Sequence, residues 1–100
     1  MKVYVASSLK NADNAVKVME KLRGLGVTIT YDWTRHGLIT DASLMKEAGE
    51  GEKRGVEDAD VLFFLHPGRT GAHVELGIAL GCKIPVVMVD GPVEEQKTFY

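Results

Sequence analysis

Short apolar runs alternate with longer segments of helical periodicity along the 100 residues of the chain. The apolar runs, which read as strands, cover residues 2–6, 27–31, 61–65 and 84–89. Apolar residues recur at helical spacing between the first two runs, again over residues 41–58, and in a third segment that ends near Gly81. The order β-α-β-α-β-α-β with short connections predicts a parallel sheet with helices on both faces.

This order predicts a flavodoxin- or Rossmann-like α/β fold. We expect a three-layer sandwich in one domain over residues 1–100, with a parallel sheet of four or five strands in the order 2-1-3-4. The topological switch point then lies between strands one and three, where open α/β sheets bind ligands. Ser7-Ser8 and the loop from His66 to Gly71 are expected to face each other there.

The segment 41–58 has the least certain helical pattern because it contains three glycines, at 49, 51 and 55. Each glycine disfavours a helix by roughly 1 kcal/mol relative to alanine, so we expect a kink or loop near Gly49 to Gly51. Thr40 or Asp41 is expected to cap this helix, and Asn11 to cap the first one. The stripe expected to face the sheet consists of Leu44, Met45, Ala48, Val56 and Ala59.

The charge and cysteine content of the chain bear on which partners and compartments we expect for the protein. The 12 basic and 14 acidic residues give a net charge of −2 and form no basic patch, so we expect no nucleic-acid binding. The single cysteine, Cys82, excludes an intrachain disulfide and suits a reducing cytoplasm. We expect no membrane segment, because no apolar run is long enough to span a bilayer and no signal-peptide pattern appears. No spacing of His, Asp or Glu suggests a metal site.

Glu75 is the first candidate for chemistry. It lies one or two turns into a helix that follows the apolar run 61–65 and a break at Pro67-Gly68. The helix dipole there favours negative charge, so we expect an ionised carboxylate that acts as a nucleophile or accepts hydrogen bonds from sugar hydroxyls. The alternative interpretation is ordinary complementation of the helix dipole by an acidic residue.

Glu52 is the second candidate, since it lies four residues after Ala48 and four before Val56, on the stripe that should face the sheet. Partial desolvation would raise its pKa and suit it to general acid catalysis. Alternatively, the glycines break the helix and leave Glu52 in solvent.

Three further side chains keep two interpretations each. Ser7 and Ser8 precede a helix N-terminus and either bind a phosphate or sugar hydroxyl or only cap the helix. Trp33, at the end of the second predicted strand, either belongs to the core or stacks on a base.

Four stretches together resemble the nucleoside 2-deoxyribosyltransferase-like family, which includes the deoxynucleoside 5'-monophosphate N-glycosidases. They are Val3-Tyr4-Val5-Ala6-Ser7-Ser8, Glu57-Asp58-Ala59-Asp60-Val61, Gly71-Ala72-His73-Val74-Glu75-Leu76-Gly77 and Gly81-Cys82-Lys83-Ile84-Pro85-Val86. The resemblance runs through nearly the whole chain, and its most specific part is the Gly-x-x-x-Glu-x-Gly helix start. It implies a flavodoxin-like subunit, oligomers with sites near subunit interfaces, cleavage of an N-glycosidic bond, and no metal or organic cofactor.

The resemblance also implies roles for individual residues. Glu75 matches the nucleophile that attacks the anomeric carbon, and Glu52 stands where the family has an aspartate that assists the leaving base, eight residues before Asp60. Tyr4, Ser7 and Ser8 match the region that lines the sugar or phosphate site. Family transferases often carry acidic residues just before Gly71, whereas this chain has Arg69 and Thr70, which favours an anionic substrate such as a nucleoside monophosphate. The substrate-binding candidates are thus Tyr4, Ser7, Ser8, Trp33, Arg69 and Gly71.

Several activities remain open. If water opens the glycosyl-enzyme ester, the protein is a hydrolase, and if a second base does so, it is a transferase. The competing hypotheses are a non-catalytic nucleotide-binding or interaction module on the same fold and a TIR-like NAD-cleaving domain. The expected partners are a small nucleoside or nucleotide and further copies of the chain. The tail Val93 to Tyr100 is expected to be a short helix or a subunit contact.

Overall fold

The structure, a computed structural model, describes residues 1–35, 41–68 and 70–89. Some predicted features therefore lie outside the described residues. They are Arg69, the loop positions His36 and Gly37, the turn at Asp90-Gly91-Pro92, and the tail Val93 to Tyr100.

The sheet has the predicted topology. Its four described strands are β1 (Lys2–Ala6), β2 (Thr28–Ile29), β3 (Val61–Leu65) and β4 (Val86–Val89). All neighbours are parallel and the order is β2-β1-β3-β4. The α/β fold class and the strand order are thus confirmed. β2 is shorter than its apolar run suggested, because the chain beyond Ile29 turns toward the next helix and only Thr30 still donates its N–H to Val3 O, at 3.0 Å.

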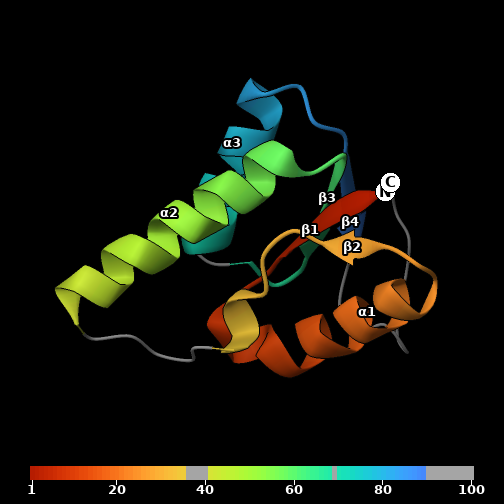
Figure 1. The fold of residues 1–100 in the computed structure, drawn as a ribbon, viewed down its shortest axis with the longest axis horizontal. Helices are drawn as coiled ribbons and strands as arrows, with labels where there is room; N and C mark the ends of the chain where they lie inside the picture. The colour runs from red at the N-terminus through yellow and green to blue at the C-terminus, as the bar shows by residue number, and fades with distance from the viewer. Residues whose placement is uncertain (36–40, 69, 90–100) are drawn as a thin grey trace.

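Helices cover both faces of this sheet (Figure 1). On one face lies α1 (Ala12–Gly24), preceded by the short 3-10 turn η1 (Leu9–Asn11). On the other face lie α2 (Ala42–Asp58) and α3 (Thr70–Gly81), which pack against each other. The largest fully buried side chains come mostly from β1 and β3, the central strands, as expected for strands covered on both faces. They are Tyr4, Phe64, Met19, Leu62, Leu65, Val3, Val5 and Val56.

Helix α2 corrects two predictions. It continues for 17 residues without a break at Gly49 to Gly51, and the predicted kink is wrong. The expected core stripe is also wrong at its start, since Leu44 and Met45 are each 54% exposed. The reason is visible in Figure 1, where the first half of α2 extends past the edge of the sheet. The predicted cap is confirmed, because the Asp41 carboxylate accepts from Ser43 N at 2.9 Å and Leu44 N at 3.1 Å.

The loops after β1 and β3 meet at the carboxyl edge of the sheet, as predicted. Ser8 N donates to Pro67 O at 3.3 Å, and Asn11 Nδ2 donates to Ser7 Oγ at 2.8 Å and to His66 O at 3.4 Å. Asn11 therefore joins the two loops and makes no side-chain cap to α1, so that cap prediction is wrong.

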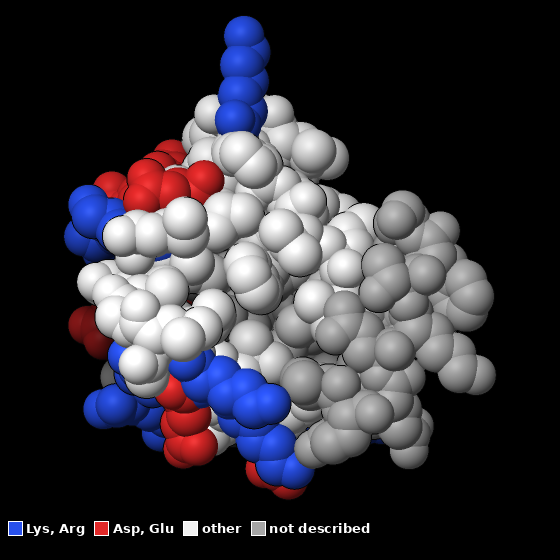
Figure 2. All heavy atoms as spheres, turned by 90° about the vertical axis from the view of Figure 1, so that its right-hand side faces the viewer, with Lys and Arg blue, Asp and Glu red and all other residues white. Residues whose placement is uncertain are grey.

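Charges of both signs are mixed on the surface. Figure 2 shows blue Lys and Arg side chains next to red Asp and Glu, with neutral atoms across the middle of that face. Within the described ranges, no helix has the length and apolar character required to cross a bilayer.

Candidate active site

The centre of the candidate site is a buried pair, Tyr4 and Glu75. Tyr4 is in the middle of β1, and the alternation of side chains along the strand turns its ring toward the face covered by α2 and α3. Glu75 is in the second turn of α3 and is only 7% exposed. The Tyr4 hydroxyl donates a short hydrogen bond to Glu75 Oε2. A buried carboxyl is thus held in one orientation by a donor from the neighbouring strand.

Burial, more than any other effect, raises the pKa of Glu75 to about 8. The hydrogen bond from Tyr4 acts in the opposite direction, and the nearby negative charge of Glu52 raises the pKa further. The prediction that the helix dipole keeps Glu75 ionised is therefore wrong. Dipole effects fall off beyond the first turn, and desolvation of a side chain pointing into the protein outweighs them.

Glu52 lies on the inner side of α2, half-buried, because the helix is not broken. Its negative charge raises the pKa values of Tyr4 and Tyr31 as well as that of Glu75, although burial is the larger cause in all three. The charged residues around it on α2 are exposed, and Arg54 Nη2 lies 3.9 Å from Glu50 Oε2. The structure thus brings Glu52 and Glu75 into one electrostatic site from two different helices.

Tyr31 is a residue of this site that the sequence pattern predicts only as the end of a strand. A Cβ atom at Gly51 would lie 2.6 Å from Tyr31 Cε1, and one at Gly55 would lie 2.8 Å from Tyr31 Cβ. The Tyr31 side chain therefore lies directly against the backbone of α2, next to Glu52. Two glycines four residues apart, beside an acidic residue on a helix, were the signal for such a close approach.

Three other predicted substrate-binding residues, Ser7, Ser8 and Gly71, differ in burial and hydrogen bonding. Ser7 Oγ is occupied, since it donates to Leu65 O at 3.1 Å and accepts from Asn11. Ser8 is 3% exposed, and its Oγ has no hydrogen-bond partner among the described residues. Gly71, the second residue of α3, is exposed, and a Cβ there would meet no atom within 4 Å.

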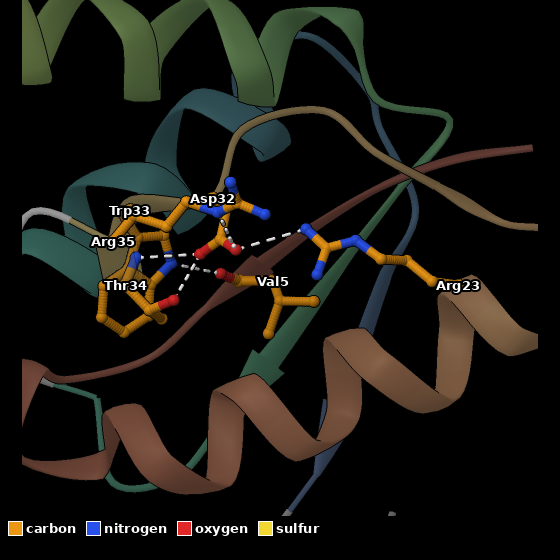
Figure 3. A network of polar contacts seen from close by, with 6 residues as sticks. All are labelled: Val5, Arg23, Asp32, Trp33, Thr34 and Arg35. Carbon is orange, nitrogen blue, oxygen red and sulfur yellow. Dashed lines mark hydrogen bonds and ion pairs between the residues drawn. The ribbon is translucent and has the colours of Figure 1, made fainter.

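Trp33 is built into the core. Its side chain is 5% exposed, and its indole Nε1 donates to Val5 O at 2.7 Å (Figure 3). This environment agrees with the interpretation of Trp33 as a core residue, because the only polar atom of its side chain is already bonded to Val5 in β1.

Asp32 fixes the turn that carries Trp33, the 3-10 segment η2 (Trp33–Arg35). Its carboxylate accepts from Thr34 N at 3.0 Å and from Thr34 Oγ1, and it pairs with Arg23 and Arg35 at 3.2 Å each (Figure 3). Partial burial would raise the pKa of Asp32, but these donors together hold it below its usual value. This network is structural, and it attaches the segment after β2 to α1.

No metal centre is formed by the part of the chain that the structure describes. Within it, no three His, Cys, Asp or Glu side chains come together as a ligand set. The titratable side chains described at the candidate site are the carboxyl groups of Glu52 and Glu75 and the phenols of Tyr4 and Tyr31.

The sequence matches no model of a protein family. No curated protein sequence matches it either. Among the solved structures that are similar over the whole chain are two enzymes. One is the CMP N-glycosidase BcmB of Clostridium botulinum, at 12% identity and a TM-score of 0.68, covering 74% of that chain. The other is a 2-deoxyribosyltransferase of Bacillus psychrosaccharolyticus, at 20% identity and a TM-score of 0.74, covering 77% of that chain. The chain thus has the fold of these two enzymes.

Proposed function

We propose that this chain is a nucleoside 2-deoxyribosyltransferase-like enzyme that cleaves the N-glycosidic bond of a nucleoside or its 5'-monophosphate. The observation that carries the proposal is the buried Glu75, oriented by the Tyr4 hydroxyl and lying within the electrostatic reach of Glu52. Paired carboxyl groups with different environments are the usual apparatus for displacement at an anomeric carbon. The fold shared with an N-glycosidase and a deoxyribosyltransferase supports the same assignment.

The proposed mechanism is a double displacement. The Glu75 carboxylate attacks the anomeric carbon while the bond from that carbon to the base breaks, and Glu52 gives the departing base its proton. The glycosyl ester on Glu75 is then opened by water, which loses a proton to Glu52, or by a second base. Tyr4 holds the carboxyl group of Glu75 in one orientation by its hydrogen bond to Oε2.

The raised pKa of Glu75 has a direct consequence for this mechanism. In the free protein Glu75 holds its proton at neutral pH, since its pKa is about 8, and only the ionised form attacks. Glu52 must hold a proton to act as the acid, so the reactive form of the site has one proton between the two carboxyl groups. The value of kcat/KM reports ionisations of the free enzyme, so it should fall as the pH rises through about 8. A kcat/KM that stays constant as the pH rises through about 8 would contradict the paired roles of Glu75 and Glu52.

An anionic substrate is the favoured class. Arg69 and Thr70 directly precede Gly71 at the start of α3, where the related transferases often carry acidic residues. The Ser8 hydroxyl, buried and with no bonding partner among the described residues, is a donor in the facing loop. We therefore propose a nucleoside 5'-monophosphate as the substrate, with Arg69 and Ser8 on its phosphate or sugar.

Incubation with deoxynucleosides, ribonucleosides and their 5'-monophosphates, followed by detection of free base, tests the proposal. Glu75→Gln should abolish base release while leaving the circular dichroism spectrum unchanged, and a quenched reaction of the native protein should carry a glycosyl adduct on Glu75. The matched control is Glu47→Gln, which removes one exposed charge from α2. Full turnover by Glu75→Gln would refute the assignment, and binding of nucleotides without any base release would favour a non-catalytic module.

We also propose that the enzyme is a homo-oligomer. Apolar side chains on α2 and α3 remain uncovered in the single chain, with Val74 58% and Leu80 63% exposed in addition to Leu44 and Met45. A subunit interface that covers these side chains would remove their apolar surface from water. Sedimentation at several concentrations tests this, and replacement of Leu44 and Met45 by lysine should shift the protein toward the monomer. A native protein that sediments as a monomer at all concentrations would refute it.

A further inference from the structure

The close contact between Tyr31 and α2 bears on the function of Glu52. Tyr31 follows the end of β2, and its side chain runs along α2 from Gly55 to Gly51. A Cβ at Gly55 would be 2.8 Å from Tyr31 Cβ, and a Cβ at Gly51 would be 2.6 Å from Cε1 and 3.0 Å from Cζ. The hydroxyl-bearing end of the ring therefore lies beside Gly51, the residue directly before Glu52.

The two glycines are required by this arrangement. Residues four apart lie on the same side of a helix, so Gly51 and Gly55 together form a flat strip without side chains. Distances below 3.0 Å from a methyl group are not tolerated, so alanine at Gly51 would displace the ring of Tyr31. Alanine at Gly55 would displace the start of the Tyr31 side chain and press on the ring of Tyr4, whose Cδ2 would lie 3.0 Å away. Gly49, two residues earlier on the same helix, has open space around its Cβ position and has no such role.

The position of the ring is fixed from the strand side as well. Thr30 Oγ1 donates to Gly55 O at 2.7 Å, and Thr30 N donates to Val3 O at 3.0 Å. These two bonds tie the end of β2 to α2 and to β1 immediately before Tyr31. Tyr31 therefore cannot shift along the helix without breaking them.

We propose that Tyr31 is a positioning residue that holds Glu52 at the candidate active site, and that Gly51 and Gly55 lack side chains in order to admit its ring. The proposal rests on the proposed function, in which Glu52 is the acid. Tyr31 touches the segment of helix that carries Glu52, whereas Tyr4 and Glu75 face Glu52 from β1 and α3. The other charged residues close to Glu52 on α2, namely Glu50, Lys53 and Arg54, are exposed.

The first test is independent of activity. The negative charge of Glu52 raises the pKa of Tyr31, second to burial, so the phenol of Tyr31 reports their proximity. Titration of the Tyr31 ring by carbon NMR should give a lower midpoint in Glu52→Gln and in Gly51→Ala than in the native protein. Gly49→Ala is the matched control and should leave the midpoint unchanged. Identical midpoints in the native protein, Glu52→Gln and Gly51→Ala would overturn the proposal.

The second test uses base release. Tyr31→Leu removes the ring that packs against Gly51, and it should lower kcat about tenfold for substrates with poor leaving bases, with KM little changed, as expected for partial loss of an acid. Substrates with activated bases should react nearly as fast as with the native enzyme. An equal loss for both kinds of substrate would refute positioning of Glu52.

The two tests separate the two proposals. If the native protein releases no base, the proposed function fails, and the NMR midpoints still decide whether Tyr31 holds Glu52. If base is released but the midpoints do not respond to Glu52→Gln, the positioning role fails and the proposed function stands. A double-mutant cycle provides a folding control, because Gly51→Ala should cost less stability in the Tyr31→Ala background than in the native one, where the ring is present to clash.

Discussion

The burial of Glu75 should make the stability of the protein depend on pH, and Glu75→Gln should remove that dependence. The pKa of Glu75 is raised from 4.5 to about 8 by folding. The folded state therefore holds the proton more tightly than the unfolded state does. This stabilisation is fully present below the unfolded pKa and is lost as the pH rises through the folded pKa, which defines a window from about pH 4.5 to about pH 8.

The size of the effect follows from the same values. Each pKa unit corresponds to about 1.4 kcal/mol, so complete ionisation of Glu75 costs on the order of 5 kcal/mol, and the loss at pH 7 is on the order of 3 kcal/mol. This is a large part of the stability of a typical small domain. Glutamine keeps the shape of the side chain and cannot ionise, so Glu75→Gln should not lose stability in this way.

Denaturant unfolding of both proteins at several pH values between 5 and 8 measures the difference. The free energy of unfolding of the native protein, relative to that of Glu75→Gln, should fall by several kcal/mol over this range. Glu47→Gln, with one exposed charge removed from α2, is the control and should follow the native curve. Parallel curves for the native protein and Glu75→Gln would refute the claim that Glu75 is buried in its neutral form.

Three further predictions concern the surrounding structure. Gly55→Ala should destabilise the protein by about 1 to 3 kcal/mol through its clash with Tyr31. Gly49→Ala has open space around it and should stabilise the protein by about 0.5 to 1 kcal/mol. Equal effects of the two variants in thermal unfolding would contradict the packing of α2. Trp33→Phe removes the donor to the carbonyl of Val5 and should lower the free energy of unfolding by about 1 to 3 kcal/mol. An unchanged midpoint in denaturant unfolding would show that this hydrogen bond is dispensable. Asp32→Asn should destabilise the protein at neutral pH. The difference in free energy of unfolding between the two proteins should shrink as the pH falls through the lowered pKa of Asp32, because the native carboxylate then also loses its charge. A difference independent of pH would contradict the role of its ion pairs.

The sequence alone determined the strand order and the place of the candidate site. Apolar runs of strand length alternating with helical segments permit few topologies, because crossovers between parallel strands are right-handed and helices must cover both faces. Glu75 and the serine pair were also identifiable, since residues that follow the ends of β1 and β3 meet at the switch point of such a sheet. The resemblance to a nucleoside-processing family rested on these same segments.

Only the tertiary structure decided the state and the surroundings of Glu75. Its pKa depends on burial, on the Tyr4 hydroxyl 71 positions away and on the charge of Glu52 from another helix, and no local pattern contains these distances. Helix α2 shows the same limit, because its glycines predicted a break by propensity, while packing against Tyr31 requires two of them and keeps the helix whole. Local sequence specifies which helices and strands form and which residues lie at the switch point of the sheet. Desolvation of a side chain and close approach between a ring and a helix backbone arise only once these elements are packed together.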